Sequence, residues 1–205
     1  MKEKSNASFS YDALSLDEKI LFALNDLNGK YRSLDAIISW TVSDYLIPVC
    51  LCLALIYIWF IGHNKQTRYK YQLGVFSALA AMAISSGISQ LISALIERPR
   101  PFLTHDLVVL FYKPTDFSFP SNSVAACFAI AAVVSTFNKK LGLLFFVLVG
   151  ILAFSRVYVG VHYPSDVVMG AIIGILSIIP VYLLRKLMEP MPTCFIKVAR
   201  IFRLA

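Results

Sequence analysis

The sequence predicts an all-α fold, a polytopic membrane helix bundle with five transmembrane helices and one N-terminal interfacial helix. Composition is the first reason: 58% of the 205 residues are hydrophobic, 15% are charged and the mean hydropathy is +0.71, outside the usual range of soluble domains. The second reason is a set of windows without formal charge, each near the roughly 20 residues that cross a hydrocarbon core, although the fourth is short. These windows cover residues 45–62, 71–96, 117–138, 141–155 and 167–184.

The chain before the first window is more polar. Residues 1–18 have no apolar core, so we expect a polar tail and not a signal peptide. Between residues 19 and 40, apolar side chains recur in a helical rhythm among charges, which favours a helix lying in the outer membrane interface. A sixth span over this segment is the alternative. We expect residues 19–188 to form one membrane domain and residues 189–205 to form a basic cytoplasmic tail.

Basic residues predict the orientation of the bundle. Lys and Arg follow the first window, separate the third from the fourth and follow the fifth, so these ends are predicted to be cytoplasmic. The loops 97–116 and 156–166 then face outward. The formal net charge of +7 lies mostly beside the cytoplasmic ends, where membrane lipids explain it, so no nucleic-acid partner is expected. The four cysteines have neither disulfide nor zinc spacing.

Polar residues on the outward face gather in three segments, and such clusters in a membrane protein are functional candidates. The first is "ERPRPF", residues 97–102, where two prolines end the preceding helix and stiffen the chain. Arg98 and Arg100 fit two interpretations, an arginine pair at the membrane boundary or a stiffened fork that binds phosphate oxygens.

The second segment is Pro120-Ser121-Asn122-Ser123, at the head of the third window. Pro favours the first helical turn, and Ser and Asn favour the cap, so the segment predicts a helix start. Free N–H groups at a helix start also attract phosphate. Both interpretations are open from these residues.

The third segment is "SRVYVGVHYPSD", residues 155–166, between the fourth and fifth windows. If Pro164 opens a helix, Asp166 lies within reach of the imidazole of His162. A carboxylate on one ring nitrogen fixes the tautomer and leaves the other nitrogen free to attack. A lone interfacial histidine is more often structural, but Arg156 and Asp166 at fixed offsets favour a catalytic site.

These residues together resemble the three motifs of the type 2 phosphatidic acid phosphatase superfamily of membrane lipid phosphatases. The family patterns are Lys-x6-Arg-Pro, Pro-Ser-Gly-His and Ser-Arg-x5-His-x3-Asp. Ser155 to Asp166 matches the third pattern in full, and the other two are matched in part. Within the superfamily, "ERPRPF", "FPSN" and "FSRVYVGVHYPSD" resemble the BcrC-type undecaprenyl-diphosphatases linked to bacitracin resistance.

The resemblance implies a role for each matched residue. His162 would attack phosphorus and become phosphohistidine, with Asp166 orienting it, and water would then hydrolyse the intermediate. The phosphate oxygens would be bound by Arg100, Arg156, the Ser121 hydroxyl and the N–H groups of Asn122 and Ser123. No metal and no cofactor are expected, because the outward face has no cluster of carboxylates.

The chain departs from the family patterns at two positions. Ser93 stands where the first motif has Lys, and we expect Arg98 to replace that phosphate-binding charge. Ser123 stands where the second motif has the His that protonates the leaving oxygen. His105, in "FLTHDL", is either a replacement acid or an ordinary loop residue.

The missing acid favours one substrate class. A diphosphate releases a phosphate monoester, whose second pKa is about 6, so it leaves without an acid. A phosphate monoester releases an alkoxide, whose conjugate acid is closer to the value of about 15.7 for water. Ser123 therefore favours a diphosphate substrate, or else an impaired enzyme.

The sequence thus predicts hydrolysis of undecaprenyl diphosphate, which recycles the peptidoglycan lipid carrier, on the periplasmic or external face of a bacterial plasma membrane. The alternatives are a phosphatase of phosphatidate or phosphatidylglycerophosphate, and a lipid-phosphate binder or transporter that has lost turnover. The sequence makes no prediction of oligomeric state.

Overall fold

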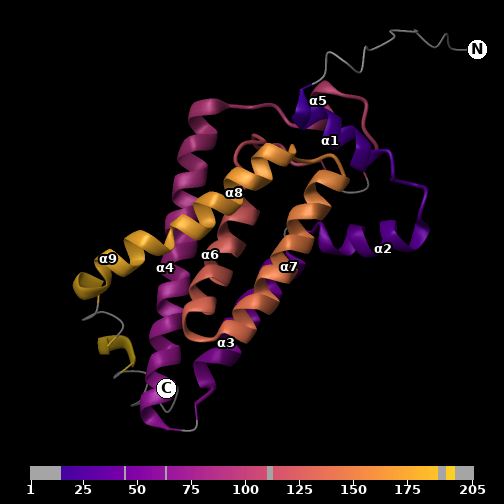
Figure 1. Cartoon of the computed structure of the whole chain (residues 1–205). Coiled ribbons are helices and arrows are strands. Elements are labelled where there is room, and N and C mark those ends of the chain that lie inside the picture. Colours follow the sequence, from indigo (N-terminus) through magenta and orange to yellow (C-terminus); the bar gives the residue numbers. More distant parts are fainter. Residues whose placement is uncertain (1–14, 44, 63, 110–112, 189–192, 197–205) are drawn as a thin grey trace, which may run out of the picture.

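The structure is a computed structural model that describes residues 15–43, 45–62, 64–109, 113–188 and 193–196 (Figure 1). The elements within these ranges are helices, which confirms the all-α prediction. They are α1 (Leu16–Asn25), α2 (Arg32–Thr41), α3 (Leu46–Phe60), α4 (Lys65–Ile96), α5 (Pro101–Thr104), α6 (Asn122–Phe137), α7 (Lys139–Tyr158), α8 (Pro164–Leu176) and α9 (Ile178–Met188).

Helix α6 lies at the centre of the bundle and packs against α4, α7 and α8 (Figure 1). Small side chains on α6 let its neighbours approach its backbone. The closest approach is to α8: a Cβ added at Gly170 would lie 2.6 Å from the backbone oxygen of Ser121, and one at Gly174 would collide with Ala125. Two glycines therefore set the α6–α8 distance on which the site depends.

Every predicted window contains a helix. By length and composition, three segments of the described chain can cross a membrane: Lys65–Thr104, Lys139–Tyr158 and Pro164–Leu184. Asp35–Thr41 and Leu46–Phe60, bent by 56° to each other, make a fourth if taken as one span. Helix α6 has only 16 residues, about 24 Å. Helix α6 is therefore shorter than a candidate span, and it begins inside the bundle, where Ser121 is fully buried. The protein is a multi-pass membrane protein with three to four candidate spans.

The predicted interfacial helix is two helices, α1 and α2, separated at Gly29, whose φ is 81°. Neither is long enough for the alternative sixth span. Helix α1 begins at Leu16, inside the predicted polar tail, because Ser15 and Glu18 form a reciprocal capping box. Residues 1–14 of that tail, and most of the basic tail 189–205, lie outside the described residues.

Helix α1 packs onto the end of the bundle, beside α5 and the connection between α7 and α8 (Figure 1). Leu21 is fully buried in a cluster with Val157 and Tyr163. The amide of Asn25 donates to the carbonyl oxygens of Tyr158 and Val108, both at 3.0 Å. The N-terminal helix is therefore part of the folded domain and reaches the segment that carries His162.

Candidate active site

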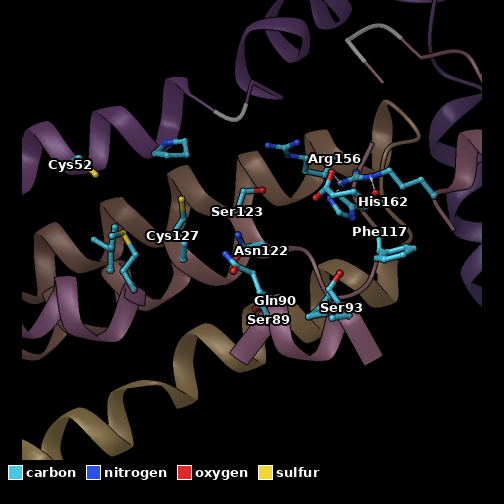
Figure 2. A pocket seen from close by; sticks show the side chains of 18 residues that line it. Cys52, Ser89, Gln90, Ser93, Phe117, Asn122, Ser123, Cys127, Arg156 and His162 are labelled. Carbon is cyan, nitrogen blue, oxygen red and sulfur yellow. Dashed lines mark hydrogen bonds and ion pairs between the residues drawn. The ribbon is translucent and has the colours of Figure 1, made fainter. Parts of the chain in front are cut away.

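Three chain segments meet at one end of the bundle, where α4 and α7 finish and α6 and α8 begin. Helix α4 ends at Ile96, and its C-cap residue Glu97, with a φ of 50°, turns the chain out of the helix before the two prolines. The segments enclose a cavity of about 620 Å³ (Figure 2). Five of the predicted site residues line it: Arg100, Asn122, Ser123, Arg156 and His162.

His162 is buried, and its surroundings define which ring nitrogen carries the proton. Nδ1 lies 2.8 Å from the backbone oxygen of Ser118. A carbonyl oxygen only accepts hydrogen bonds, so Nδ1 carries the proton and Nε2 keeps its lone pair. Nε2 lies 3.3 Å from Nη1 of Arg100, at the wall of the cavity. The arrangement presents a neutral imidazole nitrogen where an anionic group would be held.

Burial lowers the pKa of His162 from its ordinary value of 6.5. The positive charges of Arg100 and Arg156 act in the same direction, and the carboxylate of Asp166 opposes them. The neutral form, which is the nucleophilic form, is therefore favoured around neutral pH.

Asp166 lies within ion-pair distance of His162, as its spacing predicted, but it does not form a direct hydrogen bond with the imidazole. Its Oδ2 is 3.7 Å from Nδ1 of His162, beyond hydrogen-bond distance. Oδ2 accepts instead from the hydroxyl of Ser118 and from the backbone N–H of Tyr163 at 2.8 Å. Asp166 is at the N3 position of α8, so its carboxylate turns back to cap that helix. Ser118 is the group that orients the imidazole, and Asp166 holds Ser118.

Arg98 does not reach the cavity, contrary to the predicted phosphate-binding role. Its Nη1 donates to Oδ1 of Asp166 at 2.7 Å, and its Nη2 pairs with Oδ2 of Asp17 at 2.8 Å. Its guanidinium also lies over the ring of Tyr163, 3.9 Å from the centroid. Two carboxylates and an aromatic face hold it on the far side of Asp166. This geometry makes Arg98 a positioning residue for Asp166.

Asp17 is a site residue that sequence reasoning missed. It accepts from the backbone N–H of Ser165 at 2.8 Å and from the Ser165 hydroxyl, in addition to its ion pair with Arg98. An N-terminal helix is thereby tied to the start of α8. The capping sequence "SLDE", residues 15–18, was the available signal for this helix, but no local pattern indicated its partner.

Arg100 and Arg156, the two arginines predicted to bind phosphate, are both buried and line the cavity. Arg100 donates from Nη1 to the backbone oxygen of Val161 at 3.0 Å, and its Nη2 pairs with Oδ1 of Asp116 at 2.8 Å. The Asp116 side chain is 71% exposed at the cavity, so this carboxylate occupies the guanidinium face that a phosphate would use. Asp116 is a second site residue without a sequence signal.

The Pro120 to Ser123 segment divides between two roles. Asn122 and Ser123 open α6 and line the cavity, where first-turn N–H groups have no partner within the helix. Ser121 does not line the cavity, and its hydroxyl neither caps α6 nor finds a partner among the described residues. Its N–H donates to the backbone oxygen of Asp166 at 3.0 Å. The predicted phosphate contact from the Ser121 hydroxyl is therefore not supported.

His105, the possible replacement acid, also lies away from the cavity. Its Nε2 is 3.4 Å from Oε1 of Glu18, and its ring packs edge-on against Phe22. This position supports the interpretation as an ordinary loop residue. Within the described ranges, no group of three or more His, Cys, Asp or Glu side chains is arranged to hold a metal ion.

The cavity is graded in polarity along its length (Figure 2). One end has His162, Arg100 and Arg156. The other end lies between α3, α4 and α6 and is apolar, with Pro48, Cys52, Met82, Cys127 and Ile130. Such a cavity suits a molecule with an anionic head and an apolar tail.

Comparison with known proteins gives consistent results. A model of the PAP2 superfamily matches residues 74–188. The chain is similar to the bacitracin transport permease protein BcrC of Bacillus licheniformis, with 31% identity over 160 residues, 78% of this chain and 75% of that one. It is also similar to undecaprenyl-diphosphatase BcrC of Bacillus subtilis strain 168, with 30% identity over 164 residues, 78% of this chain and 80% of that one.

Two solved structures share the fold. The crystal structure of Aquifex aeolicus LpxE aligns with a TM-score of 0.67 and 26% identity, over 84% of this chain and 98% of that one. A transmembrane PAP2 type phosphatidylglycerolphosphate phosphatase from Bacillus subtilis aligns with a TM-score of 0.63 and 21% identity, over 88% and 89% of the two chains.

Proposed function

This chain belongs to the PAP2 superfamily and is a membrane lipid phosphatase, and on that premise we propose that it hydrolyses undecaprenyl diphosphate to undecaprenyl phosphate and inorganic phosphate. One observation carries the proposal. The unprotonated Nε2 of His162, which accepts a hydrogen bond from Arg100, faces a cavity with two buried guanidiniums at one end and an apolar region at the other. The name of the relative from Bacillus subtilis supports the same substrate.

The proposed reaction has two steps. Nε2 of His162 attacks the terminal phosphorus in line, the bond from that phosphorus to the bridging oxygen breaks, and undecaprenyl phosphate leaves with the electron pair. Arg100 and Arg156 neutralise the equatorial oxygens while the Ser118 carbonyl holds the imidazolium that forms. Water then attacks the phosphohistidine, releases inorganic phosphate and restores neutral His162. Before the first step, the phosphate must displace the Asp116 carboxylate from Arg100.

The cavity lining also supports a diphosphate substrate. Ser123 stands at the cavity where the family has a histidine acid, and His105 lies outside it. Among the described residues that line the cavity, no second histidine stands beside His162 to serve as an acid. A prenyl phosphate leaving group needs no acid, whereas an alkoxide does.

The proposal places the site on the periplasmic or external face of a bacterial plasma membrane, where the reaction recycles the peptidoglycan lipid carrier. Basic residues at the opposite end of the bundle support this orientation, because Lys65, Lys139 and Lys140 lie there.

The test is phosphate release by the purified protein in detergent. We expect faster release from undecaprenyl diphosphate than from phosphatidate or phosphatidylglycerophosphate, and no release by His162→Ala. Substrate labelled at the terminal phosphate should leave acid-labile, base-stable label on the protein after rapid quenching. Equal rates for wild type and His162→Ala would remove the mechanism, and a preference for either monoester would overturn the substrate.

A second candidate is a lipid-phosphate binder or transporter. The name of the relative from Bacillus licheniformis, a transport permease, favours it, as does Ser123 in place of the acid. Binding of prenyl diphosphate without phosphate release would establish it. A binder needs positive charge but no oriented nucleophile, so the Ser118–His162 hydrogen bond at 2.8 Å favours the enzyme.

A further inference from the structure

A row of neutral polar side chains lies between the two ends of the cavity. Ser89, Gln90 and Ser93 project from α4, and Asn122 and Ser123 face them from the start of α6 (Figure 2). None of these five residues carries a charge. The row is distinct from the guanidiniums beside His162 and from the apolar region beside Cys127 and Cys52.

Ser89 is fully buried, and its hydroxyl has no hydrogen-bond partner among the described residues. Buried helical serines elsewhere in the bundle donate back to their own helix: Ser85 to the carbonyl of Met82 at 2.9 Å and Ser155 to that of Leu152 at 2.7 Å. Such a bond is the ordinary solution for a serine inside a helix. Ser89 lacks one although it lines the cavity, so its donor is available to a molecule inside.

Asn122 shows the same feature on the opposite wall. Its Oδ1 is buried without a partner in the described part of the chain. Rotation of the carboxamide by 180° presents the NH₂ group at the same place, because the two ends of an amide have nearly the same shape. Two helices therefore direct unused hydrogen-bonding capacity into one region of the cavity.

In-line attack determines what this region contacts. The leaving group departs on the side of the phosphorus opposite the attacking Nε2 of His162. From His162, the cavity leads past Ser93 and Ser123 toward Cys127 (Figure 2). The leaving group thus lies along the polar row, and the chain attached to it continues into the apolar end.

We propose that Ser89, Gln90, Ser93, Asn122 and Ser123 form a subsite for the second, non-transferred phosphate of a diphosphate lipid. The proposal rests on the proposed function. Ser89 and Ser93 are one helical turn apart, about 6 Å along α4, a length that suits one phosphate group. Hydroxyl and amide donors satisfy the oxygens of this phosphate.

The absence of charge in the row has a consequence for turnover. The second phosphate becomes the head of the product, which must leave for the membrane. Neutral donors hold an anion less tightly than a lysine does, because charge-assisted hydrogen bonds are roughly twice as strong. Ser93, where the family has lysine, therefore suits a subsite that releases a phosphorylated product.

The test uses binding, which does not depend on catalysis. The double variant Ser89→Ala/Ser93→Ala and the control Ser85→Ala are compared with wild type by calorimetry in detergent, with methylenediphosphonate and inorganic phosphate as ligands. Methylenediphosphonate spans both sites, whereas phosphate occupies the arginine end alone. We expect the Kd of methylenediphosphonate to rise about tenfold in the double variant. The Kd of phosphate, and both Kd values in Ser85→Ala, should stay within about twofold.

Three outcomes decide between explanations. Unchanged methylenediphosphonate binding, or equal weakening of both ligands, overturns the subsite. The subsite would also be overturned if the double variant lost binding of phosphatidylglycerophosphate but kept binding of methylenediphosphonate. The five polar side chains would then bind the hydroxyl groups of a lipid headgroup. If wild type releases no phosphate from undecaprenyl diphosphate, the proposed function fails independently of these Kd values. If the double variant does not fold, Ser93→Ala alone is measured against the same two ligands.

Discussion

Replacing Arg98 with alanine distinguishes between two roles for this residue. The structure supports a positioning role, because Arg98 bridges Asp166, whose side chain is 0% exposed, and Asp17. Loss of one partner from a buried ion pair costs about 3–5 kcal/mol. The Arg98 side chain is 29% exposed, so solvent screening reduces the expected cost to about 2–3 kcal/mol. In a chain of this size, that cost lowers the Tm by about 4–12 °C.

The effect on catalysis should appear in kcat. Without Arg98, Asp166 holds Ser118 less firmly, and the carbonyl that orients His162 moves. We expect kcat for the prenyl diphosphate to fall about tenfold or more, because a displacement of about 1 Å at the reacting groups has a large effect on rate. KM should change little, since Arg98 does not line the cavity.

Asp17→Asn is the matched variant. It keeps a similar shape but removes the charge that pairs with Arg98 in α1. A positioning role predicts a smaller loss of stability, about 1 kcal/mol, in the same direction. It also predicts that the effects in the double variant are less than additive. A phosphate-binding role predicts the opposite: Arg98→Ala raises KM without a loss of Tm, and Asp17→Asn lowers KM by freeing the guanidinium. That result would refute the positioning role.

Four other outcomes are expected. Because burial lowers the pKa of His162, the acid limb of the kcat/KM profile should have its midpoint below pH 6.5, and a midpoint above pH 6.5 would contradict this. Below pH 6.5 the unfolded chain binds more protons at this histidine than the folded chain does, so His162 also makes the stability fall as the pH drops. Asp116→Asn should lower the KM for diphosphate by about fivefold, because it removes the carboxylate that competes with phosphate for Arg100; the gain is about 1 kcal/mol. An unchanged KM would show that this carboxylate does not compete. Gly170→Ala should lower stability by about 1–3 kcal/mol and reduce activity, because the new Cβ meets the backbone of Ser121. Gly150→Ala is the control and should do neither, because Gly150 has open space around it. The Tm measures stability, and phosphate release measures activity. Ser123→His should increase turnover of monoesters more than that of diphosphates, which parallel rates on the two substrate types would test.

The match between sequence and structure is good where function depends on local spacing. Arg156 and His162 are close in the chain, so one short connection between two helices brings both to the cavity. Arg100 and Ser123 also reach it, because each stands at the end of a predicted helix on the same side of the membrane. Each apolar window that hydropathy identified contains a helix of the bundle, because apolar segments of this length are stable as helices in the membrane.

The predictions failed where a side chain had a choice of partners. Arg98 and Arg100 are two residues apart on one stiff segment, and the sequence does not indicate which faces the cavity. Asp166 reaches His162 as its spacing predicted, at 3.7 Å, but the hydrogen bonds of its carboxylate go to its capping position and to Ser118, which the spacing did not indicate. Helix α6 is shorter than a candidate span, and it begins inside the bundle, at a depth that hydropathy does not report.

The sequence by itself determined the all-α membrane fold and the superfamily motifs that contain His162, because these depend on composition and on residues close in the chain. Only the tertiary structure decided how His162 is held. Ser118 orients His162, Asp17 reaches Arg98 from an N-terminal helix, and Ser89 faces Asn122 across the cavity. These contacts join residues far apart in sequence. Their geometry follows from how the helices pack, above all from the close contact of α6 and α8 at Gly170.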